Sequence, residues 1–396
     1  MVDAVLANAK TRLFDLTRLI NRAGLHPTGV DRVERAYLRE LVSGRGARLF
    51  GLARTALGYV LLDHDGCSRL AEAVETGDWG KADIVSRLNP RLDGPRRRGQ
   101  SFVRSIAVAR TRKSRLSAML DTHLPRNTSY LNVGHSNLDS AMFSALGGLR
   151  KVILIHDTIP LDFPETQRVG AVAAFRKKLA LVSRHADQVI CTSAQCEADV
   201  TRWFADMGRV PPITTALLGI DVPEVDPDFL VPKAPYFVCV GTIEPRKNHA
   251  LLFDIWDDWG PDAPPLIVCG KRGWNNDAVF ARLDAGIPQI VEMNDLSDGQ
   301  IGALLQNATA MLFPSYSEGF GLPPAEALAL GCRVLCADLP VYGEILGNHA
   351  VYASHLDRYL WEKTIKKLAT AVSGDQTSQY DPPTWAAHFK AVLTAV

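Results

Sequence analysis

The stretch MLFPSYSEGFGLPPAEALALGCRVLC, residues 311–336, decides the fold that we predict for this chain. It begins with a short apolar strand and continues through a loop that contains Glu318 into a helix. Pro323 and Pro324 suit the first helical turn, where a backbone amide has no intrahelical partner to lose, and Gly331 suits the left-handed position just past the helix end. Strand, loop, helix and the next strand form half of a nucleotide-binding α/β unit.

Two carboxylates mark this stretch, Glu318 in the loop and Glu326 near the start of the helix. Gly319 and Gly321 let the backbone approach a ligand closely and turn its amides toward it. Glu326 taken alone is explained equally well by the helix macrodipole, which favours acids in a first turn. Glu318 favours a binding site, because loops at the carboxyl edge of a parallel sheet are where such folds bind ligands.

The segment EGFGLPPAE resembles the E-x7-E signature of the retaining glycosyltransferases with the GT-B fold, in particular glycosyltransferase family four. The resemblance implies an α/β fold with two doubly wound, Rossmann-like domains that face a central cleft. It also implies that Glu318 acts beside the donor sugar and that Glu326 holds the ribose of the nucleotide. The loop expected around the donor sugar consists of Gly319, Phe320, Gly321 and Leu322.

The length of 396 residues exceeds the usual size of one core and predicts two domains. Four prolines and four acids in residues 221–235 predict an extended linker between them. With the resemblance, we expect an acceptor-binding domain over 1–228, a nucleotide-sugar-binding domain over 229–380, and a terminal helix in 381–396 that crosses back to the first domain. The net charge of +1 gives no argument for a nucleic-acid partner.

The seven cysteines show no zinc-type clustering. Cys332 and Cys336 suggest a metal or redox pair by spacing, but the strand-like Arg-Val-Leu between them favours core packing. Charges interrupt the first 25 residues, so the apolar core of a signal peptide is missing, and the sequence has no run of about 18 apolar residues. We therefore expect a cytoplasmic protein, with membrane contact limited to the inner face of the plasma membrane.

The segment GTIEPRKN places a second set of charges after another predicted strand, which ends at Gly241. Arg246 and Lys247 stand just before a helix that we expect Asn248 to cap, and cations there are unfavourable for the macrodipole unless an anion binds. Two solvated loop cations are the alternative. The pattern resembles the diphosphate-binding Arg-Lys pair of the family, and Lys271, which follows the next strand, is expected to add to it.

The first domain offers a glycine loop and two polar strand ends. Gly29 precedes a helix expected to begin near Asp31, and the resemblance implies that this loop faces the donor phosphates and the acceptor, with Arg32 as a weaker candidate. His135-Ser136-Asn137 and His156-Asp157 follow two predicted parallel strands, so they point toward the ligand crevice. The resemblance implies that His156 meets the donor sugar near the reacting carbon, and Asn137 is a candidate for the acceptor or phosphate loop.

Two charged segments remain open. Asp63-His64-Asp65-Gly66 has a D-x-D pattern that metal-dependent sugar transferases use, but the glycine favours a solvated turn, so we predict no metal. Arg96–Arg115 carries eight basic residues and no acid. Such a segment suits an anionic membrane surface, and a solvated helix or loop face, or a disordered insert, explains it equally well.

The resemblance implies a retaining, metal-independent hexosyltransferase with no cofactor beyond its nucleotide-diphospho-sugar donor. Mannose or a similar hexose is the first guess for the sugar, and a saccharide or lipid-linked saccharide of bacterial-type surface polysaccharide is the expected acceptor. No side chain stands out as a covalent nucleophile, which favours a front-face route in which the leaving phosphate deprotonates the acceptor. A nucleotide-sugar epimerase of the same fold and a non-catalytic membrane-surface subunit are the alternatives.

Overall fold

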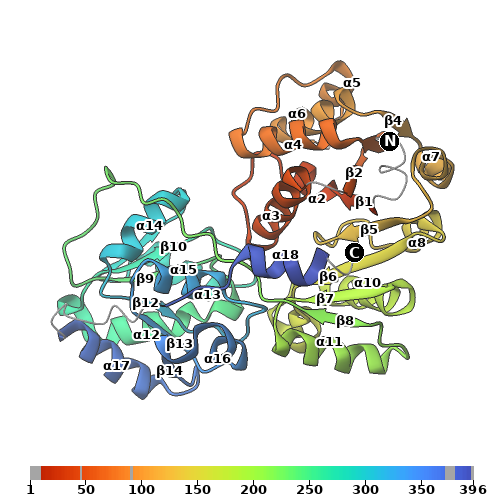
Figure 1. Cartoon of the computed structure of the whole chain (residues 1–396). Coiled ribbons are helices and arrows are strands. Elements are labelled where there is room, and N and C mark those ends of the chain that lie inside the picture. Colours follow the sequence, from red (N-terminus) through yellow and green to blue (C-terminus); the bar gives the residue numbers. More distant parts are fainter. Residues whose placement is uncertain (1–9, 45–46, 90–91, 371–379, 394–396) are drawn as a thin grey trace.

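The computed structural model describes residues 10–44, 47–89, 92–370 and 380–393, which form two α/β domains side by side (Figure 1). The strand order is β4-β3-β2-β1-β5-β6-β7-β8 in the sheet of the first domain and β11-β10-β9-β12-β13-β14 in the sheet of the second. Neighbouring strands are parallel except at β2–β3 and β3–β4. Two doubly wound domains, as predicted from the sequence, are confirmed.

The first domain contains eight strands and ten α-helices within the described residues. Its strands are β1 (Lys10–Asp15), β2 (Ala47–Thr55), β3 (Gly58–Leu62), β4 (Ala109–Thr111), β5 (Thr128–Asn132), β6 (Arg150–Ile155), β7 (Gln188–Cys191) and β8 (Ile213–Thr215). Its α-helices are α2 (Thr17–Asn21), α3 (Gly29–Ser43), α4 (His64–Thr76), α5 (Ile84–Arg87), α6 (Gly94–Ser105), α7 (Leu116–His123), α8 (Ser140–Leu146), α9 (Ile159–Asp162), α10 (Ala171–His185) and α11 (Ala194–Asp206).

The second domain repeats the alternation of strand and helix. Its strands are β9 (Phe237–Val240), β10 (Leu266–Cys269), β11 (Ile290–Met293), β12 (Ala310–Phe313), β13 (Val334–Ala337) and β14 (Val351–Ala353). The helices are α12 (His249–Trp259), α13 (Asp277–Ala285), α14 (Asp298–Asn307), α15 (Leu322–Ala329), α16 (Pro340–Leu346), α17 (Arg358–Thr370) and α18 (Trp385–Leu393). Short 3-10 helices are η1 (Lys113–Arg115), η2 (Pro164–Thr166), η3 (Pro245–Lys247), η4 (Gly260–Asp262) and η5 (Gly347–His349).

The stretch that predicted the fold forms β12, α15 and β13. The two prolines occupy the first turn of α15, and Gly331 follows its end with φ +78°, a conformation that a Cβ disfavours. Every residue of β12 and of β13 is buried, as expected for central strands covered by helices on both faces. The local prediction is confirmed.

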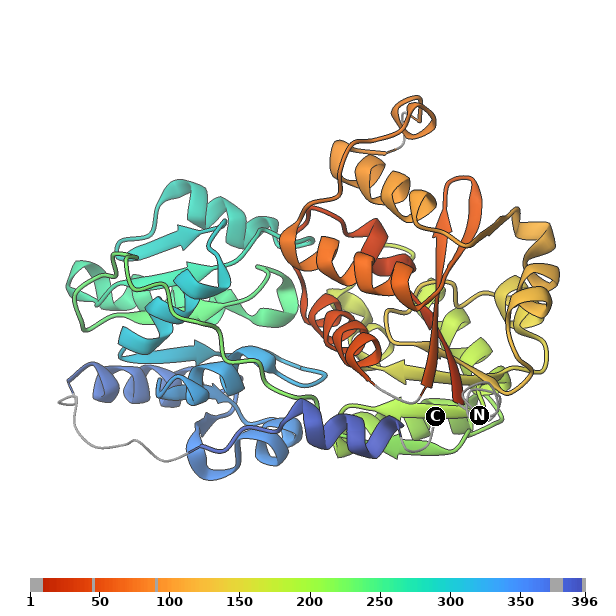
Figure 2. The same ribbon diagram turned by 45° about the horizontal axis from the view of Figure 1, so that its top comes forward.

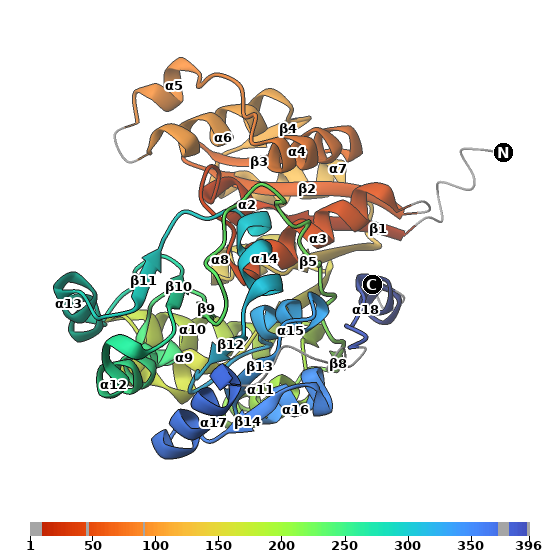
Figure 3. The same ribbon diagram turned by 90° about the vertical axis from the view of Figure 1, so that its left-hand side faces the viewer.

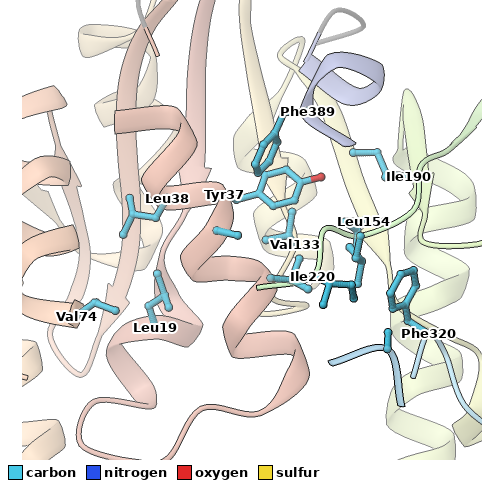
Figure 4. Packing of buried hydrophobic residues seen from close by; sticks show 14 of the residues in the cluster. Leu19, Tyr37, Leu38, Val74, Val133, Leu154, Ile190, Ile220, Phe320 and Phe389 are labelled. Carbon is cyan, nitrogen blue, oxygen red and sulfur yellow. The ribbon is translucent and has the colours of Figure 1, made fainter. Parts of the chain in front are cut away.

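Helix α18 packs against the first domain (Figures 1 and 2). Tyr37 of α3 hydrogen-bonds through its hydroxyl to His388 Nε2 at 2.7 Å, and its ring meets that of Phe389 edge-on, with centroids 5.0 Å apart. Figure 4 shows this pair in one apolar cluster, which also contains Phe320 of the second domain. The hydrophobic core therefore continues from one domain to the other.

Polar contacts also join the domains. The Glu344 carboxylate of α16 accepts from the amide of Ala194 at the N-terminus of α11, at 2.9 and 3.0 Å. Trp274 Nε1 donates to the carbonyl of Thr166 at 3.0 Å, and the same indole lies under the guanidinium of Arg168. The two carboxyl edges of the sheets are thus held facing each other.

The basic segment Arg96–Arg115 is not a disordered insert or one continuous helix, because it contains α6, β4 and η1. The N-terminal part of α6 is anchored by Asp93, which accepts from the amide of Arg96. Arg104 is buried and donates to Asp83 at 2.5 Å and to Ser86 at 2.6 Å. One of the eight positive charges of this segment is therefore buried and neutralised by a carboxylate of the first domain.

The turn expected at Asp63–Gly66 is wrong, because Asp63 instead caps α4 by accepting from the amide of Gly66 at 2.9 Å. All seven cysteines are buried and free, which confirms core packing for Cys332 and Cys336. Within the described residues, no cluster of three or more His, Cys, Asp or Glu side chains has a metal-binding arrangement. Among the helices described, none is both long and apolar enough to cross a membrane.

Candidate active site

A compact cluster of charges lies at the carboxyl end of β9. Arg246 Nη1 and Lys247 Nζ lie 2.6 and 2.7 Å from the same oxygen of Glu318, and Arg246 Nη2 lies 2.7 Å from Glu244. Burial by itself raises the pKa of Glu318, but the two cations outweigh it and lower that pKa to about 2. Glu318 is therefore ionised at neutral pH, and two cations share two carboxylates in a largely dry site.

Backbone geometry explains why this sequence brings the cluster together. Gly241 ends β9 with φ +137°, and a Cβ there would lie 3.3 Å from Lys247 Cε, so glycine leaves room for the lysine. Asn248 adopts a left-handed conformation (φ +53°) between η3 and α12. The expected Asn248 side-chain cap is wrong, since its oxygen instead accepts from the Tyr316 hydroxyl at 2.8 Å.

The loop after Glu318 touches the first domain. A Cβ on Gly319 would lie 2.6 Å from the carbonyl oxygen of His156, and one on Gly321 would lie 2.5 Å from the ring of Tyr342. Gly321 also has φ +92°. The loop can occupy this position only with glycine at both places, and Phe320 between them is buried in the interdomain core.

His156 follows β6 and is fixed by the backbone. Its Nε2 donates to the carbonyl of Val133 at 2.7 Å, and burial lowers its pKa to about 4. The ring is therefore neutral at pH 7, with Nδ1 left as a hydrogen-bond acceptor. His135 is held in the same way by the carbonyl of Leu154, and the two rings lie 5.2 Å apart.

Asp157 is a site residue to which the sequence alone assigned no role of its own. It lines, with Glu318 and Gly319, a cavity of about 330 Å³ between the domains. Burial raises its pKa to about 6, and the carboxylates of Glu318 and Glu244 add to this while Arg246 opposes it. The only sequence signal was its position directly after His156 at a strand end.

The Glu326 side chain contacts the first domain. Arg32 of α3 forms an ion pair with Glu326 of α15 and lies 3.4 Å from Asp298 of α14. Figure 3 shows α14 and α15 beside α3. Gly29, the first residue of α3, faces the same region, since a Cβ there would lie 3.6 Å from Leu322 Cδ1. The pKa of Glu326 is raised, because the effect of burial exceeds the opposing effect of the Arg32 charge.

Two other predicted residues lie apart from the charge cluster. The Lys271 side chain is half exposed and lies 3.1 Å from Asp295. Asn137 is buried and donates to Asp15 at 2.8 Å and Thr17 at 2.6 Å, so its amide orders the loop after β5. The helix opened by Gly29 begins two residues earlier than expected, with Thr28 as its N-cap and Asp31 completing a capping box.

Comparisons with known proteins agree with this arrangement. Residues 224–380 match the family model described as glycosyl transferases group 1. Over 226 residues the chain is 34% identical to the serotype-specific mannosyltransferase WbdA of Escherichia coli, an alignment that covers 51% of this chain and 27% of WbdA. Over 240 residues it is 26% identical to the O-antigen chain mannosyltransferase RfbU of Salmonella typhimurium, covering 58% of this chain and 65% of RfbU.

The chain thus spans about a quarter of WbdA and just under two thirds of RfbU. Among solved structures, Anabaena Alr3699/HepE in complex with UDP-glucose has a TM-score of 0.58 at 14% identity, and the match covers 97% of this chain and 94% of that one. TarM has a TM-score of 0.52 at 14% identity, with 68% and 53% covered. The chain therefore has the GT-B glycosyltransferase fold, and its second domain matches the glycosyl transferases group 1 model.

Proposed function

We propose that this chain transfers a hexose, with mannose as the first candidate, from a nucleotide-diphospho-sugar to a saccharide acceptor in the assembly of a bacterial-type surface polysaccharide. The cluster of Arg246, Lys247 and Glu318 at the interdomain cavity is the observation that carries the proposal. The similarity to WbdA and RfbU, which are both mannosyltransferases, supports the choice of sugar.

The cluster suits a diphosphate that departs with negative charge. Arg246 and Lys247 both point at one acidic oxygen, so a donor diphosphate can take over the charge that Glu318 balances in the structure. As the bond between sugar and phosphate breaks, these cations stabilise the developing charge. In this proposal they supply what a metal ion supplies in other sugar transferases, and no cofactor is needed beyond the donor.

The other residues position the sugar. Glu318, released from one of its cations, orients sugar hydroxyls, and His156 of the first domain, whose Nε2 is bound to the carbonyl of Val133, offers Nδ1 as an acceptor. Glu326 binds the ribose after giving up part of its ion pair with Arg32. The anomeric configuration is retained by a front-face route in which a leaving phosphate oxygen takes the proton of the acceptor hydroxyl. An inverted product linkage, seen by proton NMR, would contradict this route.

Thermal stabilisation by nucleotide sugars tests the proposal. A donor at about 100 times its dissociation constant should stabilise the protein by about 2.7 kcal/mol. GDP-, UDP- and dTDP-sugars are compared, and Arg246→Ala should abolish most of the shift that the best donor gives. Arg282→Ala is the matched control, because Arg282 also bridges two carboxylates, Asp254 and Asp257, but lies outside the site. Stabilisation that survives Arg246→Ala unchanged would disprove the phosphate site.

Membrane contact belongs to the proposal through helix α5, which precedes the expected segment Arg96–Arg115, together with a cation of that segment. Helix α5 lies at the outer end of the first domain (Figure 1), and three large apolar side chains in and just after it are exposed, Ile84 by 73%, Val85 by 51% and Leu88 by 77%. The exposed Arg87 and Arg98 lie on α5 and α6. Apolar groups beside cations suit an anionic bilayer surface.

Liposome flotation tests this contact. The fraction of wild-type protein that floats with the vesicles should be larger for vesicles with about 30% anionic lipid than for neutral vesicles. Ile84→Ser with Leu88→Ser should reduce the bound fraction severalfold, because two exposed apolar anchors are lost. Leu230→Ser, an exposed leucine in the interdomain linker, is the control and should bind as wild type. Equal binding of all three proteins would place any membrane contact elsewhere.

A further inference from the structure

A second cavity, of about 730 Å³, opens on the first domain at the carboxyl ends of β1, β2 and β5. It adjoins the candidate active site, because His135 lines it and lies with its ring 5.2 Å from that of His156. Three cations line it, Arg18, Arg54 and Lys178. None of the described residues in its wall is acidic.

The three cations are incompletely neutralised. Lys178 Nζ donates to the carbonyl of His135 at 3.1 Å, and among the residues described no carboxylate forms an ion pair with it. The nearest carboxylate oxygen to Arg54 belongs to Asp139, at 4.0 Å. Arg18 shares Asp31 with Arg22. Burial lowers the pKa of Lys178, and the positive charge of Arg18 lowers it further. The cations of the wall therefore repel one another, and a bound anion would reduce that repulsion.

The wall is rigid and rich in donors. His135 and Asn137 have left-handed backbones, with φ +56° and +58°, which is uncommon outside glycine and concentrates at ligand sites. Asn132 holds this loop by accepting from the amide of His135 and donating to the carbonyl of Ser136. The side-chain carbonyl of Gln100 accepts from the amide of Ala56. Its NH₂ group therefore supplies the donor on the side of the cavity that Gln100 lines.

We propose that this cavity binds a phosphoryl group of the acceptor, with Arg54 and Lys178 as direct partners and Arg18 beside them. Three converging cations suit a group with more than one negative charge better than a neutral sugar. The inference rests on the proposed function, since it places the acceptor beside His156. The phosphoryl group belongs either to a soluble sugar phosphate or to a lipid carrier. The second source fits the geometry, because Asn89 and Leu92, which follow the apolar α5, also line the cavity.

Calorimetric titration tests the cavity separately from the donor site. The nucleotide site is first saturated with GDP, so that phosphate probes cannot report on Arg246 and Lys247. Mannose 6-phosphate and geranyl phosphate are then compared with methyl α-mannoside, which has no charge. At least one phosphorylated probe should bind about tenfold or more tightly than the neutral sugar, as expected for charge-assisted hydrogen bonds.

Arg54→Gln combined with Lys178→Gln should weaken the phosphorylated probe about tenfold or more while leaving GDP affinity unchanged. Lys177→Gln, an exposed lysine next to Lys178 on α10, is the control and should bind as wild type. Binding of mannose 6-phosphate supports the soluble source, and binding of geranyl phosphate alone supports the lipid carrier.

The inference is overturned if neither phosphorylated probe outbinds methyl α-mannoside, or if the double variant binds them as wild type. It is also overturned if the preference for phosphate disappears in Arg246→Ala and persists in the double variant. The donor proposal is contradicted by different results, namely a lack of nucleotide-sugar binding or of turnover. The phosphate titrations therefore do not decide the donor proposal, and the donor tests do not decide whether the cavity binds phosphate.

Discussion

Gly319 lies at a close approach between the two domains in the active site. A Cβ there would lie 2.6 Å from the carbonyl oxygen of His156, and backbone on the opposite side cannot rotate away as a side chain can. Gly319→Ala should therefore push the donor loop away from His156 while each domain stays folded. We expect turnover to fall by about 10²-fold, as is typical for a misplacement of about 1 Å.

Gly343→Ala is the matched control for this substitution. Gly343 lies in α16, and a Cβ there meets nothing within 4 Å, so the added methyl group should stabilise the helix by about 0.5–1 kcal/mol and leave turnover unchanged. Circular dichroism checks the fold of both variants. Wild-type turnover in Gly319→Ala would show that the domain contact seen here is not needed for the reaction.

Asp157 predicts a pH dependence of stability. Its folded pKa is raised to about 6 from 3.8, so the folded state holds the proton more tightly than the unfolded state. The stabilisation from that proton is complete below pH 3.8 and is lost as pH rises through 6. Asp157→Asn, which mimics the protonated form, should then unfold at higher urea than wild type at pH 7.5.

The gain in unfolding free energy from Asp157→Asn should be at most about 3 kcal/mol, since one pKa unit is worth about 1.4 kcal/mol. It should vanish in urea titrations at pH 4. A variant that loses stability equally at both pH values would indicate that the carboxylate is held favourably and that its charge is not opposed by Glu318 and Glu244.

At the residue scale, the sequence indicated candidate groups at strand ends but did not reveal which residues of the two domains form pairs. Arg246, Lys247 and Glu318 were all selected from their own strand ends, and the structure places them around one oxygen. The pair of Arg32 with Glu326 joins residues 294 positions apart, and nothing in either segment indicates its partner. Asp157 acquires its raised pKa from burial and from the carboxylates of Glu318 and Glu244, which belong to the other domain.

At the element scale, a neutral histidine makes the polar contacts that dock α18 beside its apolar ones. His388 Nε2 lies 2.7 Å from the hydroxyl of Tyr37, and Nδ1 lies 3.0 Å from the carbonyl of Leu217, so Nδ1 carries the proton and Nε2 accepts. Burial lowers the pKa of His388 to about 4. A depressed folded pKa gives stability that is present above pH 6.5 and is lost as pH falls toward 4.

Hydrogen exchange in α18 should therefore become faster between pH 7 and pH 5, after correction for the intrinsic effect of pH. His388→Gln keeps a donor and an acceptor but cannot titrate in this range, so its corrected exchange should not change with pH. Corrected rates in the wild type that are equal at the two pH values would mean that this histidine does not control the docking of the helix.

Elements with strong local signals were predictable, and those governed by tertiary contacts were not. The proline pair and the glycine end of α15 depend only on backbone preferences. The basic segment that includes α6 was left open, because its fate depends on Asp83, which neutralises Arg104 from a different helix cap. The end of β8 at Thr215 also depends on tertiary contacts, because the carbonyls of Ala216 and Leu217 that follow it pair with His388 of α18.

At the scale of the whole molecule, the two sheets present their carboxyl ends to a shared site. The doubly wound pattern was predictable because central strands such as β6, β10 and β12 are buried apolar runs, each followed by a turn. The way in which the domains approach each other was not predictable from the sequence. It depends on long-range contacts, such as Glu344 of α16 at the N-terminus of α11 and the Trp274 ring under the guanidinium of Arg168. Catalysis in our proposal depends on that approach, since the donor cations and His156 come from different domains.

Acceptor-dependent release of nucleoside diphosphate is the measurement that tests this proposal most directly. Purified protein is incubated with the nucleotide sugar that stabilises it best, with and without a panel of saccharide and sugar-phosphate acceptors, as wild type, Arg246→Ala and Arg282→Ala. The proposal predicts release only with an acceptor, a loss of about 10²-fold in Arg246→Ala, and no change in Arg282→Ala. Release at the same rate without any acceptor, or undiminished turnover in Arg246→Ala, would contradict it.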